Sequence, residues 1–119
     1  MMNTIPPTER DLHAGVVEYL KLVLLPGAVL HHSPNEGKRG WKAQRDIKSH
    51  GTKAGWPDLE ILHHGKTYFV ELKSSKGRLT PRQKLCHEQL QQAGFHVETC
   101  RSLDEVLTCC QKWGLIDAA

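Results

Sequence analysis

The sequence predicts a single small α/β domain in which helices pack on a mixed β-sheet. Apolar residues recur at helical spacing over residues 8–25, which predicts an amphipathic helix. Residues 66–73 alternate between two faces, which predicts a strand. Helical and strand patterns then alternate through the remaining sequence, in the order α-β-β-β-α-β-α. The chain of 119 residues falls in the usual range for one domain, so we expect residues 1–119 to form one unit.

The first helix is predicted over residues 8–25. Thr8 is a suitable N-cap, and Glu9 and Asp11 place acidic groups in the first turn, where the helix dipole favours them. Pro26-Gly27 ends the pattern, and residues 28–32 form a short apolar run typical of a strand. Residues 33–55 are rich in Gly, Lys, Ser and Asn. We expect a long connection there, with room for one helical turn near residues 41–48.

The second half of the chain is predicted to begin with a β-hairpin. Residues 59–63 and 66–73 form its strands, with His64-Gly65 as the turn. A helix follows over residues 80–93, with Pro81 at its first position and a stop at Gly94. Residues 95–99 form a last strand. A final helix over residues 102–113 opens with a capping box in which Ser102 is followed three residues later by Glu105.

Composition excludes several classes of protein. No stretch approaches the roughly 20 apolar residues of a membrane span, and the N-terminus lacks the apolar centre of a signal peptide. We therefore expect an intracellular protein that does not bind membranes. The four cysteines contain no C-x-x-C pair, and the two histidine doublets are poorly placed for chelation, so we expect reduced thiols and no zinc site.

Positive charge is clustered although the net charge is only +3. One group lies in the long connection between residues 37 and 53, and another follows Glu71. Such clusters suit the phosphate backbone of nucleic acid, although a solvated loop and a solvated helix start would carry the same charges. The residues we expect to contact DNA phosphates are Lys38, Arg39, Lys42, Arg45, Lys76 and Arg78.

Three charged residues are predicted to converge at one rim of the sheet. Glu71 and Lys73 are two apart on one strand and should point the same way. Asp58 begins the preceding strand, and a hairpin brings the start of its first strand beside the end of its second. Carboxylate oxygens suit Mg²⁺, and a lysine beside the cation can orient or deprotonate an attacking water. A cross-strand salt bridge is the simpler alternative for the Glu-x-Lys pattern alone.

Three ordered motifs resemble the virus-type replication-repair nuclease (VRR-NUC) domain, a branch of the PD-(D/E)XK nuclease superfamily. The motifs are Gly55-Trp56-Pro57-Asp58, Phe69-Val70-Glu71-Leu72-Lys73 and the segment GRLTPRQ at residues 77–83. The resemblance spans about residues 8–107. It implies a restriction-endonuclease-like fold and divalent-metal-dependent cleavage of DNA phosphodiester bonds.

The resemblance also implies a set of metal ligands. Asp58 and Glu71 match the acidic ligands of the family, and the Leu72 carbonyl would add a further oxygen. The family has a glutamate on its first helix that completes the metal shell. Glu9 fits this position best, and Glu18 is its competitor.

Other site residues follow from the same resemblance. Lys73 matches the catalytic lysine, and Gln83 matches a motif glutamine that would face the site and fix a water or phosphate. Asn35 resembles a polar residue of the family's connecting loop. Trp56 departs from the family pattern, where a smaller aliphatic residue is more usual, and is expected to pack or to stack on DNA.

These observations predict a DNA endonuclease with Mg²⁺ as cofactor, which Mn²⁺ could replace. The resemblance implies roles in replication, recombination or repair, in the cytoplasm or nucleoid, and it leaves open a virus or phage as the source. Because one such domain cuts one strand, we expect a homodimer that nicks branched DNA, with four-way junctions as the best candidate. The alternative is a nuclease-fold DNA-binding module that lacks catalysis, or a subunit of a larger complex.

Overall fold

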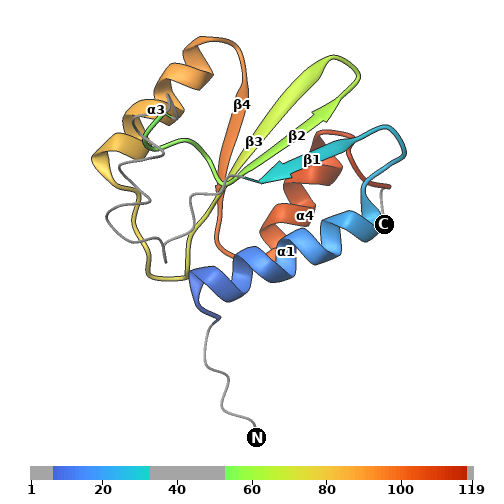
Figure 1. The fold of residues 1–119 in the computed structure, drawn as a ribbon, viewed down its shortest axis with the longest axis horizontal. Helices are drawn as coiled ribbons and strands as arrows, with labels where there is room; N and C mark the ends of the chain where they lie inside the picture. The colour runs from blue at the N-terminus through green and yellow to red at the C-terminus, as the bar shows by residue number, and fades with distance from the viewer. Residues whose placement is uncertain (1–6, 33–52, 118–119) are drawn as a thin grey trace, which may run out of the picture.

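Four strands form one mixed sheet in the order β1-β2-β3-β4 (Figure 1). The computed structural model describes residues 7–32 and 53–117. The strands are β1 (Val29–His32), β2 (Leu59–His63), β3 (Lys66–Leu72) and β4 (His96–Cys100). The helices of the described residues are α1 (Glu9–Val23), α3 (Pro81–Gln92) and α4 (Leu103–Lys112). The predicted order α-β-β-β-α-β-α is confirmed, while the helical turn predicted near residues 41–48 lies outside the described residues.

Helix α1 begins where its cap was predicted. The Asp11 backbone N–H donates to Thr8 Oγ1 at 3.0 Å, which satisfies one of the free amides of the first turn. The helix ends at Val23, two residues earlier than expected, because Leu24 is extended and pairs with Ile116 in an isolated antiparallel bridge. This bridge ties the end of α1 to the segment that follows α4.

The hairpin of β2 and β3 follows the predicted strands closely. The two strands are antiparallel, with Leu59 opposite Val70, and β1 adds antiparallel to β2. His64 has φ of 52° and Gly65 has φ of 75°, as a tight two-residue turn requires. Strand β3 ends at Leu72 rather than one residue later, and β4 pairs with β3 in parallel.

Two apolar layers cover the two faces of the sheet. Helices α1 and α4 lie side by side on one face, and α3 lies on the other (Figure 1). On β3 the buried side chains of Tyr68, Val70 and Leu72 belong to the layer of α1 and α4, while Phe69 packs with the residues of α3. The predicted alternation of β3 is therefore confirmed, and each helix layer has its own core.

The capping boxes differ from the prediction. Ser102 accepts the Glu105 N–H at 3.1 Å as expected, but the Glu105 carboxylate accepts the N–H of Arg101 at 2.8 Å instead of the N–H of the cap residue. The complete box lies at the start of α3. There Thr80 Oγ1 accepts the Gln83 N–H at 3.1 Å, and Gln83 Oε1 accepts the Thr80 N–H at 2.9 Å. The sequence pattern indicated only Pro81 at the start of α3, but the structure shows that Thr80 and Gln83 also cap this helix.

Two expectations about composition can be compared with the described part of the chain. None of its helices has the length and apolar character needed to cross a membrane. All four cysteines are free thiols, and three of them are buried. The thiols of Cys100 and Cys109 lie 3.8 Å apart between β4 and α4.

Candidate active site

Two carboxylates face each other at the end of the β2–β3 hairpin. The antiparallel pairing of Leu59 with Val70 places Asp58 opposite Glu71, one step beyond the end of the ladder. The Leu72 backbone N–H donates to Asp58 Oδ2 at 2.8 Å, so the Asp58 side chain is held against β3. The structure therefore brings Asp58 and Glu71 together, as hairpin geometry predicted, and it is the N–H of Leu72 that contacts Asp58.

Burial makes this carboxylate pair electrostatically unfavourable when both groups are charged. Burial, followed by the charge of Glu71, raises the pKa of Asp58 to about 7. Burial also raises the pKa of Glu71 to about 7, although its hydrogen bond with Asp58 and the charge of Lys73 oppose this rise. A divalent cation would remove the repulsion by neutralising both groups.

Helix α3 holds the Glu71 carboxylate from the other side. Gln83 Nε2 donates to Glu71 Oε2 at 3.3 Å, and His87 Nε2 lies 3.3 Å from Glu71 Oε1. Because the capping box engages Gln83 Oε1 with the N–H of Thr80, the amide group presents its N–H₂ to the site. The structure places Gln83 at the site, where its amide contacts Glu71, and the first turn of α3 fixes its orientation.

Lys73 joins the site through α1. It follows the last residue of β3, and its buried Nζ lies 3.5 Å from Glu9 Oε1. We expected Glu71 and Lys73 to point the same way, but their side chains contact different helices. Glu71 contacts α3, whereas Lys73 contacts the start of α1. Strand alternation does not extend to Lys73, because β3 ends at Leu72. The structure brings Glu9 to the site. Glu18 is nine residues further along α1, roughly 13.5 Å at 1.5 Å per residue, and lines a separate groove.

The Gly-Trp-Pro-Asp motif lies tightly against the start of α3. Gly55 has φ of 84°, and a Cβ at this position would lie 2.5 Å from the carbonyl oxygen of Arg82. Trp56 packs edge-on against Phe69 with ring centroids 5.3 Å apart, and its indole N–H donates to Glu60 Oε1 at 2.9 Å. Of the two interpretations of Trp56, the structure shows packing. Gly55 and Trp56 thus hold the segment before Asp58 against the start of α3 and against β3.

Basic residues flank the carboxylates on the turn after Lys73. Lys76 and Arg78 are exposed there. One guanidinium nitrogen of Arg101, Nη1, donates to the carbonyl oxygens of Ser74 at 2.8 Å and Gly77 at 2.6 Å, which fixes the turn on the end of β4. Four other predicted DNA contacts and the polar loop residue lie outside the described residues: Lys38, Arg39, Lys42, Arg45 and Asn35.

Three residues at or beside the site were missed by sequence reasoning. His87 contacts Glu71, Arg101 anchors the basic turn, and His13, one turn after Glu9 on α1, lowers the pKa of Asp58 through its charge. The spacing of Gln83 and His87 was a usable signal, since residues four apart share a helix face. Burial lowers the pKa of His87, which favours a neutral ring.

The donor set fits a hard divalent cation that keeps part of its water shell. In the described residues, no group of three or more His, Cys, Asp and Glu side chains is arranged to hold a metal ion. Mg²⁺, however, requires only one or two carboxylates from the protein. The opposed pair of Asp58 and Glu71, whose pKa values are raised by burial, meets that requirement.

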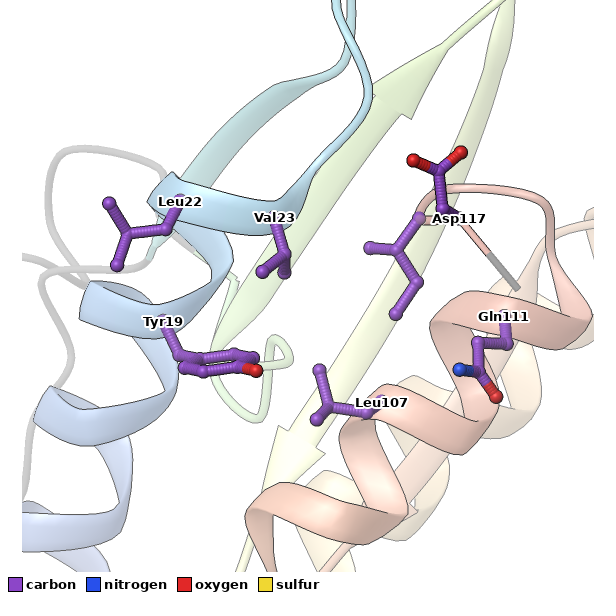
Figure 2. A pocket seen from close by; sticks show the side chains of 7 residues that line it. Tyr19, Leu22, Val23, Leu107, Gln111 and Asp117 are labelled. Atoms are coloured by element: carbon purple, nitrogen blue, oxygen red, sulfur yellow. The ribbon is translucent and has the colours of Figure 1, made fainter. Parts of the chain in front are cut away.

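A groove of about 470 Å³ lies elsewhere, between α1 and α4 (Figure 2). Tyr19, Leu22 and Val23 line it from the C-terminal half of α1, and Leu107 and Gln111 line it from α4. The carboxylate pair is not part of its lining. The groove is therefore distinct from the candidate active site, which lies at the end of the β2–β3 hairpin.

The sheet, the opposed carboxylates and the adjacent lysine define a nuclease-type domain, and comparison with known proteins identifies its family. The VRR-NUC domain family matches residues 5–104. The chain belongs to the VRR-NUC family. The resemblance in the three motifs is thereby confirmed. The nuclease-type domain of this family implies a divalent metal cofactor and DNA as substrate.

Solved structures support the same assignment. One, described as a VRR_NUC domain protein, is 26% identical, covers 92% of this chain and 89% of its own, and superposes with a TM-score of 0.71. A second, described as a VRR_NUC domain, is 21% identical, covers 90% of this chain and 99% of its own, and has a TM-score of 0.60, which supports the fold alone. A comparison with curated proteins found no match.

Proposed function

We propose that this protein is a Mg²⁺-dependent DNA endonuclease that hydrolyses phosphodiester bonds at the rim formed by Asp58, Glu71 and Lys73. The observation that carries the proposal is the opposed pair of carboxylates, of which Glu71 is buried and Asp58 partly buried, beside the buried Lys73. Glu9, at the start of α1, is the proposed third acidic group of the shell, and the Leu72 carbonyl is a further oxygen donor. Mn²⁺ is expected to replace Mg²⁺, because both accept oxygen ligands.

The residues of the chain have separate tasks in this reaction. When bound, the cation polarises the phosphoryl group and lowers the pKa of water. Lys73 orients the attacking water and offsets negative charge that develops on the phosphorus, while its contact with Glu9 holds the ammonium at the rim. Gln83 holds Glu71 in position. Water adds to phosphorus as one P–O ester bond breaks, which leaves a phosphate monoester and a hydroxyl end.

Branched DNA is the proposed substrate. Lys76 and Arg78 are exposed beside the rim, where they can contact backbone phosphates without reading sequence. The four basic residues at positions 38–45 are proposed to extend this contact. A domain with one metal centre cuts one strand, so the two matching cuts of a four-way junction require two copies related by two-fold symmetry.

A homodimer is therefore part of the proposal, acting in the cytoplasm or nucleoid. Leu22 is 82% exposed and Tyr19 is 41% exposed beside the groove of Figure 2, so α1 carries apolar surface that a second copy could bury. Light scattering at micromolar concentration measures the assembly, and Leu22→Glu is expected to shift a dimer toward monomer. A parent protein that is monomeric would contradict this part.

The test of the catalytic proposal is a panel of labelled DNAs containing four-way junctions, flaps, splayed arms and plain duplex. Each is incubated with Mg²⁺, with Mn²⁺ or with EDTA. We expect cleavage of junctions with either metal and none with EDTA, and Glu71→Gln should abolish it. Binding of junctions without cleavage would instead indicate a DNA-binding module. Equal cleavage of duplex and junction would refute the structural selectivity but not the metal site.

A further inference from the structure

We propose that His87 is a positioning residue for the active site, which holds the Glu71 carboxylate in the orientation needed to bind the cation. The inference rests on the proposed function, since it concerns the proposed metal ligand Glu71. The observation is the 3.3 Å contact between His87 Nε2 and Glu71 Oε1, with both side chains buried.

The contact completes a clamp on Glu71. Its side chain is buried, with the residue only 1% exposed, so protein donors must largely replace the water that would otherwise solvate it. Gln83 donates to Oε2, and His87 contacts Oε1, from successive turns of one helix. A carboxylate has about four lone-pair sites. The clamp therefore fixes both oxygens and still leaves lone pairs for a cation.

In the contact between Glu71 and His87, the histidine must be the hydrogen-bond donor. A glutamate that binds a cation is ionised and can only accept hydrogen bonds, so His87 must carry its proton on Nε2 in that state. Donors behind a metal-binding side chain orient it, and losing one typically costs about 10- to 100-fold in metal affinity or activity. His87 is placed to act in this way through Glu71.

The position of His87 is set by the packing of α3. The flanking residues Cys86 and Leu90 belong to the apolar cluster with Phe69 and Val97 that attaches α3 to β3 and β4. Because these contacts lie on both sides of His87 along the helix, its ring has a fixed place relative to Glu71. A flexible surface histidine could not give the carboxylate a single orientation.

The experiment compares the parent protein with His87→Leu and His87→Gln. Leucine removes the N–H donor, whereas glutamine retains one. Calorimetry with Mg²⁺ alone is expected to show about 10- to 100-fold weaker binding for His87→Leu, with His87→Gln closer to the parent. In cleavage assays, the Mg²⁺ concentration for half-maximal rate should rise in His87→Leu, and excess Mg²⁺ should restore much of the rate. A loss of folded protein would lower the rate without moving that concentration.

A matched control is His96→Gln. His96 is exposed at the start of β4, opposite Tyr68 and away from the carboxylates, so this variant should behave as the parent. If His87→Leu does not fold, calorimetry of His87→Gln decides: a Mg²⁺ affinity close to that of the parent supports the donor role, and an affinity as weak as that of Glu71→Gln overturns it. Unchanged Mg²⁺ binding in a folded His87→Leu variant would overturn the inference alone. A parent that neither binds Mg²⁺ nor cleaves would overturn the proposed function as well.

Discussion

Without metal, the carboxylate pair should destabilise the folded protein at neutral and alkaline pH, and Asp58→Asn should relieve this. The pKa of Asp58 rises from 3.8 to about 7 on folding, mainly through burial and the charge of Glu71. The folded state therefore binds protons more tightly than the unfolded state, so the stabilising effect of protonation is complete below about pH 4 and is lost as the pH rises through 7.

The expected magnitude follows from that change. A change of one in pKa corresponds to roughly 1.4 kcal/mol. The rise from 3.8 to about 7 therefore means that ionising Asp58 in the folded state costs at most about 4 kcal/mol relative to the unfolded chain. Because Asp58 is only partly buried, solvent screening reduces this, and we expect about 2 kcal/mol. Asparagine keeps an acceptor for the Leu72 N–H, and its amide can donate to Glu71, so the substitution replaces a repulsion by a hydrogen bond.

The assay is urea unfolding in EDTA at pH 5 and pH 8, followed by tryptophan fluorescence. Asp58→Asn should be more stable than the parent at pH 8 and closer to it at pH 5, and Mg²⁺ should stabilise the parent more than the variant. Comparing the two proteins cancels the titration of groups that do not interact with Asp58. Asp117→Asn, at an exposed position, is the control. A parent that is the more stable protein at pH 8 in EDTA would refute the reasoning.

Three further predictions follow from the site. Lys73→Met should reduce cleavage at least 100-fold while leaving DNA binding and the fold largely intact, as measured by cleavage rate, gel shift and circular dichroism. Gly55→Ala should lower the free energy of unfolding by about 2 kcal/mol or more, because φ of 84° is strained for alanine and the new Cβ meets the Arg82 carbonyl. Replacing Lys76 and Arg78 by glutamine should weaken binding to all DNA sequences and reduce the salt slope by about one per lost contact.

Each of these has a matched control. Lys112→Met removes an exposed lysine from α4 and should not alter cleavage, and equal rates for Lys73→Met and the parent would contradict the catalytic role. Gly15→Ala lies within α1 with nothing within 4 Å of the new Cβ, and it should stabilise the protein by about 0.5–1 kcal/mol. Lys66→Gln, at the far end of β3, should not change the salt slope. Normal salt dependence after loss of Lys76 and Arg78 would indicate a solvated surface.

Patterns within short segments of the sequence predicted most of the helices and strands, and they also predicted that Asp58 and Glu71 lie together. The opposition of Asp58 and Glu71 follows from hairpin geometry, which depends on neighbouring segments and a two-residue turn. The ends of elements shifted by one or two residues where tertiary contacts compete, as when Leu24 leaves α1 to pair with Ile116. Such a bridge joins residues far apart in sequence and has no local signal.

Residues brought in by helix packing were harder to predict. His87 approaches Glu71 only because α3 lies on that face of the sheet, and the order of elements does not fix that face. Glu9 and Glu18 both lie on α1, so periodicity could not choose between them, whereas the way α1 crosses the sheet places Glu9 beside Lys73. The contact of Arg101 with the basic turn likewise depends on where β4 ends.

The capping box of α3 limits which amino acids position 83 can hold. The capping box alone allows either glutamine or glutamate at position 83, because a side-chain oxygen of either residue can accept the hydrogen bond from the N–H of Thr80. Glutamate, however, would place a third carboxylate beside Glu71, where glutamine now donates at 3.3 Å. The start of the helix and the charge of the active site therefore select the same residue for different reasons, and only glutamine satisfies both. Gln83→Glu should leave α3 intact while making the rim more dependent on bound cation for its stability.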